Sequence, residues 1–71
     1  MEVTKIIMNN GNIYHVIWDK HRIDGDQIEI IDIQKGWVNI NLKQISEKYI
    51  LDKDFRLSTK IKNMIKENYD Y

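Results

Sequence analysis

The chain alternates short apolar runs with short polar breaks along most of its length. β-Branched and aromatic residues fill residues 3–8 and 13–18, and the Asn-Asn-Gly-Asn break between them favours a tight turn. Such runs predict antiparallel strands joined by hairpins. Two further strands are expected at residues 27–34 and 37–41, separated by a Lys-Gly turn. The polar stretch 19–26 is expected to be a loop.

The two arms of the hairpin EIIDIQKGWVNINL, residues 29–42, have different hydrophobic patterns. In the second arm, polar and aromatic residues alternate with apolar ones, so Trp37, Asn39 and Asn41 are expected to face outward. The apolar residues of this arm are expected in the core: Val38, Ile40 and Leu42. The first arm carries isoleucines on both sides. Either a β-bulge near Ile30–Ile31 brings them to one face, or both faces of this strand are covered.

Two further elements are expected after the fourth strand. Leu42 and Ile45 have the spacing of a single helical turn. A short fifth strand is expected to follow this turn at residues 46–51. The alternative is one helix that runs from Leu42 through Ile45 and Tyr49. Residues 58–69 have the clearest helical periodicity, with Ser58 or Thr59 as N-cap. The apolar stripe of this helix consists of Leu57, Ile61, Met64, Ile65 and Tyr69.

These elements predict a single domain, residues 1–71, of mainly β (α+β) class. A small antiparallel meander of four to five strands, residues 1–51, is expected to curl into a barrel. Residues 52–57 link it to the C-terminal amphipathic helix. The 71 residues include no cysteine, so disulfides and thiolate zinc sites are excluded and packing or association must stabilise the fold.

The order of the predicted elements resembles an SH3-like or Sm-like meander over residues 4–50: a strand, an Asn-Gly turn, a strand, a polar loop, a strand, a Lys-Gly turn, the strand WVNIN, the turn LKQI and a last strand. The C-terminal helix lies outside this resemblance, since Sm-like proteins place a helix before the barrel. The chain also resembles small proteins of phages and prophages of low-GC Gram-positive bacteria. That resemblance implies a modulator or inhibitor of a host protein that acts in the host cytoplasm.

No pattern in the chain indicates catalysis or cofactor binding. His15 and His21 could converge on a metal ion with nearby aspartates, but a strand histidine and a solvated loop histidine are expected instead. The loop from Asp19 places Lys20 and Arg22 where an EF-hand needs oxygen ligands. There is no Ser/His/Asp or Cys/His arrangement and no Gly-rich phosphate loop. We therefore expect a non-enzymatic protein with no catalytic residue, metal or cofactor.

Charge and hydropathy indicate where the protein acts and what it binds. The formal net charge is zero, which weakens the case for a nucleic-acid ligand. No signal peptide and no apolar run of bilayer length is present, so a cytoplasmic location without membrane contact is expected. Apolar residues on both sides of the strands predict an interaction surface, unless the C-terminal helix covers one side.

The function expected from these apolar residues on both sides of the strands is that of a protein-interaction module, self-associating or bound to a protein partner. Apolar burial around aromatic residues and hydrogen bonds from asparagines would hold the partner. The residues expected to bind it are Tyr14, Trp18, Trp37, Asn39 and Asn41. One alternative is a nucleic-acid- or nucleotide-binding barrel that uses Arg56, Lys60, Lys62 and Lys66 with exposed aromatics. A further alternative is a structural subunit of a larger assembly.

Overall fold

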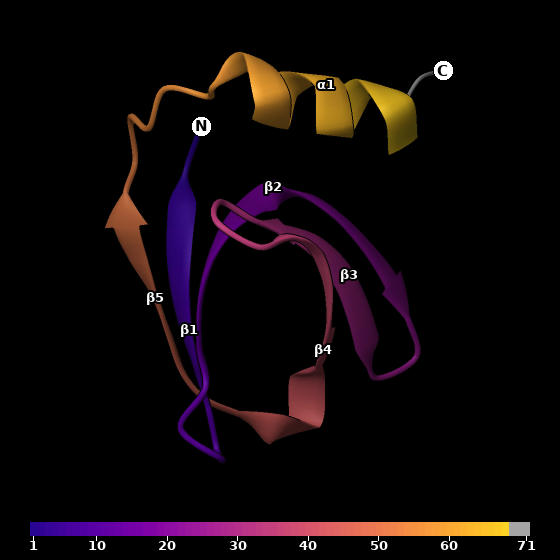
Figure 1. Ribbon diagram of the computed structural model, residues 1–71. Helices are drawn as coiled ribbons and strands as arrows, with labels where there is room; N and C mark the ends of the chain where they lie inside the picture. Colours follow the sequence, from indigo (N-terminus) through magenta and orange to yellow (C-terminus); the bar gives the residue numbers. More distant parts are fainter. Residues whose placement is uncertain (69–71) are drawn as a thin grey trace.

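The computed structural model describes residues 1–68 and consists of five antiparallel strands followed by one helix (Figure 1). The strands are β1 (Val3–Met8), β2 (Ile13–Asp24), β3 (Gln27–Asp32), β4 (Gly36–Asn41) and β5 (Ile45–Asp52). A one-turn 3₁₀ helix, η1 (Leu42–Gln44), joins β4 to β5, and the helix is α1 (Thr59–Asn68). The mainly β fold with a C-terminal helix is therefore confirmed. So are the helical turn and the fifth strand after it.

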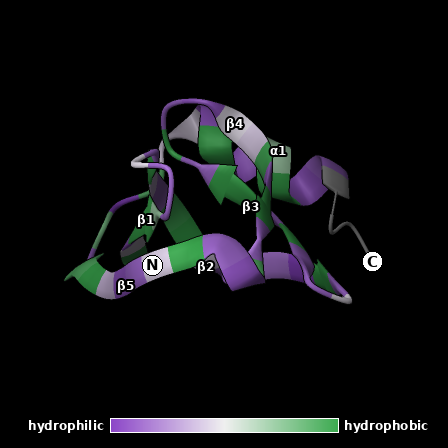
Figure 2. Ribbon diagram, turned by 90° about the horizontal axis from the view of Figure 1, so that it is seen from below, coloured by the Kyte–Doolittle hydropathy of each residue, from purple (hydrophilic) through white to green (hydrophobic). Residues whose placement is uncertain are grey.

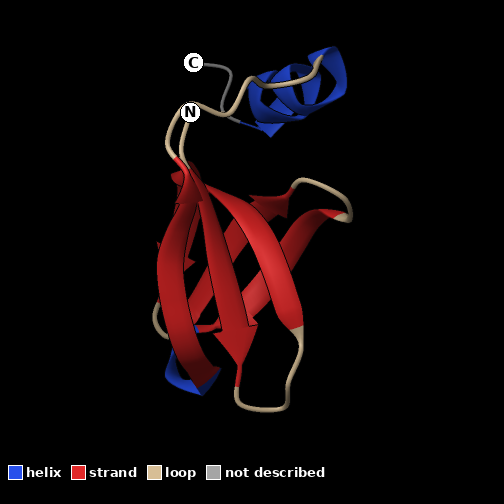
Figure 3. Cartoon of the chain, turned by 90° about the vertical axis from the view of Figure 1, so that its left-hand side faces the viewer, coloured by secondary structure: helices blue, strands red, loops and turns tan. Residues whose placement is uncertain are grey.

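The sheet is a meander whose last strand returns to the first. Its order is β4-β3-β2-β1-β5, and all neighbours are antiparallel. The sheet bends strongly around a common interior, and α1 lies beyond one end of it (Figures 1 and 3). The hydrogen-bonded order leaves β4 and β5 as the two edges of an open sheet.

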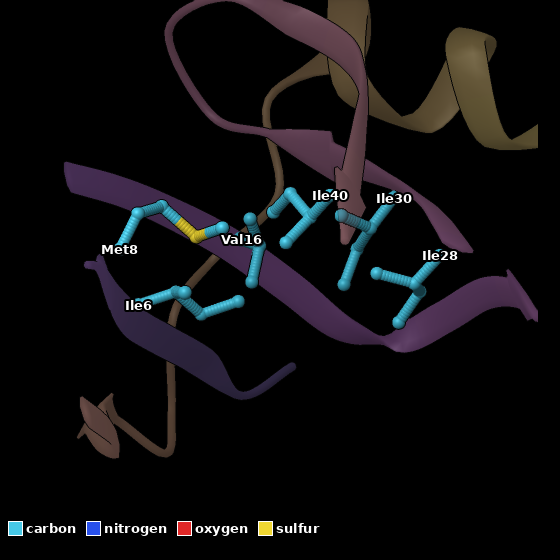
Figure 4. Packing of buried hydrophobic residues seen from close by; sticks show 6 residues of the cluster. All are labelled: Ile6, Met8, Val16, Ile28, Ile30 and Ile40. Carbon is cyan, nitrogen blue, oxygen red and sulfur yellow. The ribbon is translucent and has the colours of Figure 1, made fainter. Parts of the chain in front are cut away.

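The interior of the bend is filled by one group of buried side chains, which we call the inner cluster. It consists of Ile6, Met8, Val16, Ile28, Ile30 and Ile40 (Figure 4). Val38 and Leu42 are partly buried against it, so the predicted core face of the second hairpin arm is confirmed. β-Branched side chains from four neighbouring strands meet here because alternate residues of each strand point to the same side.

A second group, the helix cluster, lies between the sheet and α1. It consists of Val3, Ile17, Ile31 and Ile61. Ile61 comes from the predicted helical stripe, and Leu57, Met64 and Ile65 of that stripe pack around it. Tyr69, the last residue of the stripe and of the predicted helix, lies outside the described residues. The Ser58 hydroxyl accepts a hydrogen bond from the Ile61 N–H at 3.2 Å, which confirms the N-cap.

The two clusters explain the isoleucines on both sides of β3. Ile30 belongs to the inner cluster and Ile31 to the helix cluster, and both side chains are fully buried. Of the two alternatives, the bulge near Ile30–Ile31 is wrong, because β3 pairs with β4 without interruption from Gln27 to Asp32. Both faces of the strand are covered within the chain, one by the sheet's own interior and the other by α1.

The main irregularity lies in β2 instead. Between Val16 and His21 the chain advances five residues, while its partner strand moves only two, from Asp32 to Ile30. The predicted loop at residues 19–26 is also wrong, because β2 continues to Asp24. Its polar second half, mostly hydrophilic in Figure 2, forms backbone hydrogen bonds to β3 and needs no buried side chains. β3 itself ends at Asp32, two residues earlier than expected.

Asp32 organises the turn that follows β3. One carboxylate oxygen accepts hydrogen bonds from the Gln34 and Lys35 N–H groups at 2.8 and 2.9 Å. The other accepts one from the His15 N–H of β2 at 3.0 Å. Gly36 completes the turn with a φ of 85°, which a residue with a Cβ rarely adopts. The turn is therefore fixed by Asp32 and Gly36.

Candidate functional site: the exposed edge strand β5

The residues expected to bind a partner do not form one surface. Tyr14 and Trp18 are half-buried against the inner cluster, whereas Trp37 is half-buried in the helix cluster with α1. The expectation that Trp37 faces outward is therefore wrong. Asn39 is exposed, and the Asn41 side chain accepts a hydrogen bond from the Lys43 N–H as the N-cap of η1. Whether any of the five binds a partner stays a prediction.

Three consecutive exposed apolar side chains lie on β5 instead. Tyr49, Ile50 and Leu51 are 45%, 47% and 53% exposed, and every residue of the strand after Ile45 is exposed. β5 hydrogen-bonds only to β1, so its other edge presents backbone N–H and C=O groups that no neighbouring strand pairs. The opposite edge, β4, has a single exposed side chain, Asn39. β5 is thus the more open edge of the sheet.

Two irregularities delimit the regular part of β5. The register with β1 shifts between Ile7 and Met8 and again between Val3 and Thr4, so β5 has an extra residue at each place. Between them, Glu47–Ile50 pairs evenly with Ile7–Thr4. Bulges limit how far another chain can extend along an edge. The regular edge that β5 offers is therefore four residues long.

A pocket of about 390 Å³ opens beside this segment. It is lined by Glu2, Thr4, Trp18, Lys48, Tyr49 and Ile50. Thr4 and Ile50 are directly paired residues of β1 and β5, and Lys48 pairs with Ile6 of the inner cluster. Lys48 and Ile50 therefore lie on the same side of the sheet as the inner cluster. The pocket runs from the edge strand to the indole of Trp18.

Trp18 is held in place by two neighbours. The Lys48 ammonium lies 3.8 Å from the centre of the indole ring, which is cation–π geometry. The His21 ring centre lies 5.1 Å away, and its Nδ1 is hydrogen-bonded to the Trp18 carbonyl at 2.5 Å. Because a carbonyl can only accept, Nδ1 carries the proton. The aromatic wall of the pocket is therefore positioned before any ligand arrives.

The basic residues of the nucleic-acid alternative lie elsewhere. Arg56, in the linker, and Lys60, Lys62 and Lys66, on α1, are all exposed. Tyr14 and Trp18 pack against the inner cluster, and α1 covers the helix cluster, so this basic set and those aromatics do not share a surface. A smaller pocket of about 240 Å³ between the β3–β4 turn and α1 includes Lys60 but no aromatic residue. The nucleic-acid alternative stays a prediction.

The two histidines lie in different surroundings. The His15 backbone N–H is bound by Asp32, whereas the His21 ring lies against Trp18. Within residues 1–68, no group of three or more His, Cys, Asp or Glu side chains is placed to hold a metal ion. No helix in this part of the chain is long and apolar enough to cross a membrane.

Comparison with known proteins gave no matching family model, no similar curated protein and no similar solved structure. The resemblance to phage-encoded SH3-like or Sm-like proteins therefore stays a prediction. The site must be interpreted from its own geometry.

Proposed function

We propose that this protein is a non-enzymatic interaction module that binds a protein partner through β5. The observation that carries the proposal is the row of exposed Tyr49, Ile50 and Leu51 on an edge strand with one unpaired side. An edge of this kind is a template for an added strand. Exposed apolar patches on edges also mark interaction sites.

We also propose that the curled sheet is an SH3-like fold and that the partner is a host protein whose activity the module modulates. The meander order and the one-turn helix before β5 support the first part. The second part rests on the resemblance to phage proteins alone. Self-association and a place in a larger assembly are alternatives that would use the same edge. Experiment distinguishes them from binding to a host protein.

In the test, tagged protein captures partners from a lysate of the cells that naturally produce it. The wild-type protein is compared with two matched variants. Leu51→Lys charges β5, whereas Ile23→Lys charges a side chain of similar exposure, 59%, near the end of β2. We expect a specific partner that Ile23→Lys retains and Leu51→Lys loses, because Leu51 is the most exposed apolar side chain of β5 and a lysine there removes apolar contact with the partner. A partner retained by both variants would refute the role of β5. A wild-type protein that captures nothing and is monomeric by light scattering would refute the function itself.

A further inference from the structure

We propose that the partner segment is a short extended peptide that pairs with Glu47–Ile50 of β5. It carries a large apolar side chain for the pocket beside Trp18 and, two residues away, an acidic side chain for Lys48. This inference rests on the proposed function and names the ligand class of the same site.

The length of the segment follows from the edge. Only Glu47–Ile50 continues the regular ladder, and the extra residues on either side of it bend the strand. An added strand can therefore form regular backbone hydrogen bonds over about four residues. Such a short match fits a linear motif better than a long strand of another folded sheet.

The apolar side chain follows from the position of the pocket. In an added strand, the residue opposite Ile50 points to the same side of the sheet as Ile50. That side holds the pocket of about 390 Å³, whose walls include Ile50 and the Trp18 indole. Pockets of roughly 300 Å³ or more are large enough for specific ligands. A large apolar side chain at this position would cover Ile50 at the mouth of the pocket.

The acidic side chain follows from Lys48. Its ammonium lies over the Trp18 ring. In the described part of the chain, Lys48 forms no ion pair within 4.0 Å. Lys48 and Ile50 are two residues apart on one side of the strand, so their opposite residues in an added strand are also two apart. Glu2, the other charged residue of the pocket wall, precedes β1 and forms no ion pair with Lys48 within 4.0 Å.

A second copy of the chain fits this edge less well. If two β5 strands pair antiparallel with matching faces, a register centred on Lys48 places two ammonium groups opposite each other. A register centred on Tyr49 places Lys48 opposite Ile50 and extends into the irregular region at Leu51. Neither register gives Lys48 a carboxylate partner; a register centred on Ile50 would place it opposite Asp52, but Leu51 and Asp52 lie beyond the regular segment. The occupant that we favour is therefore a peptide segment of another protein.

The probes are two acetylated, amidated peptides, Thr-Phe-Thr-Asp-Thr and its reverse Thr-Asp-Thr-Phe-Thr, because the edge accepts a strand in either direction. In two-dimensional NMR titrations of the ¹⁵N-labelled protein, we expect one of them to shift the amides of Glu47–Ile50 and the Trp18 indole N–H saturably. Replacing its phenylalanine by alanine should weaken binding about tenfold or more, because a buried aromatic side chain is lost. Replacing its aspartate by lysine should weaken it about fivefold.

A charge exchange on the protein identifies the contact. With Lys48→Glu, the lysine peptide should bind better than the aspartate peptide, which reverses the wild-type order. The matched control is Lys62→Glu on the exposed side of α1, which should leave the order unchanged. Circular dichroism verifies that both variants are folded. A change that merely loosened β5 would weaken both peptides alike and would not reverse their order.

Four results would overturn the proposal. The first is that neither peptide shifts β5 at millimolar concentration. The second is that Lys48→Glu leaves the order of the peptides unchanged. The third is a dimer by light scattering with β5 shifts that depend on protein concentration, which would assign the edge to a second copy. The fourth is that an eight-nucleotide oligothymidylate shifts the Trp18 indole more strongly than either peptide. If peptides fail while Leu51→Lys still abolishes partner capture, the proposed function stands without this ligand.

Discussion

Removing the Asp32 carboxylate should destabilise the protein more than removing any other acidic side chain in the described part of the chain. Asp32 is only 3% exposed, and its oxygens accept three backbone N–H groups, from Gln34, Lys35 and His15. These bonds close the β3–β4 turn and also join it to β2. Asp32→Ala would leave all three donors without this acceptor, two of them in a turn that water can reach.

The expected loss follows from the number and type of these bonds. A hydrogen bond to a charged acceptor contributes roughly 1.5 kcal/mol or more to stability. The bonds from Gln34 and Lys35 contribute less than this, because water can reach their N–H groups in the exposed turn. We expect Asp32→Ala to lower the free energy of unfolding by about 3 kcal/mol. Domains have about 0.05–0.15 kcal/mol of stability per residue, so this is a large part of the total for 71 residues. Asp32→Asn keeps an oxygen for the turn but places an amide near the His15 N–H, and should cost about 1–2 kcal/mol.

Urea denaturation followed by far-UV circular dichroism measures these differences through the midpoint and slope of each transition. Asp24→Ala, at an exposed position near the end of β2, is the control and should change the free energy of unfolding by less than about 0.5 kcal/mol. A loss below about 1 kcal/mol for Asp32→Ala would refute the structural role given to this carboxylate. So would equal losses for the alanine and asparagine variants.

Substitutions at four further positions test the fold. Ile30→Ala and Ile31→Ala should each cost about 3 kcal/mol in urea unfolding, since both side chains are fully buried on opposite sides of β3; a cost below 1 kcal/mol for Ile31 would show that α1 does not cover it. Gly36→Ala should lower the thermal midpoint more than Gly25→Ala. Both have positive φ, but a Cβ at Gly36 would also lie 3.2 Å from a methionine methyl of α1, while nothing lies within 4 Å of one at Gly25. Ser58→Ala should cost about 1 kcal/mol through loss of the N-cap, measured by chemical denaturation, and Ser58→Asp should restore most of it.

Local signals in the sequence predicted most elements of the fold. The turn residues around Gly11 and Gly36 set the first and third hairpins, and the spacing of Leu42 and Ile45 predicted the turn before β5. The second half of β2 was missed because all its side chains except that of Ile23 are polar or charged. Its strand conformation comes from backbone pairing with β3, and hydrophobic periodicity does not indicate backbone pairing.

The doubled isoleucines show why a pattern alone could not separate a bulge from two covered faces. Both arrangements bury the same side chains, so composition and parity are identical in the two cases. The decision depends on where α1 packs, which places Ile31 and Ile61, thirty residues apart in the chain, in one buried cluster. Trp37 was misplaced for the same reason, because the predicted outward side of β4 lies under α1.

The candidate site could not be located from the sequence because exposure on β5 is a consequence of strand order. Residues 49–51 read as an ordinary apolar strand, and such a strand in the middle of the sheet would be buried on both sides, as β3 is. Its position after β1 at the edge leaves Tyr49, Ile50 and Leu51 exposed, and the curl of the sheet brings Lys48 over an indole that belongs to β2. The isoleucines on both sides of β3 are thus buried within the chain, whereas Tyr49, Ile50 and Leu51 remain exposed side by side on the strand that follows the 3₁₀ turn.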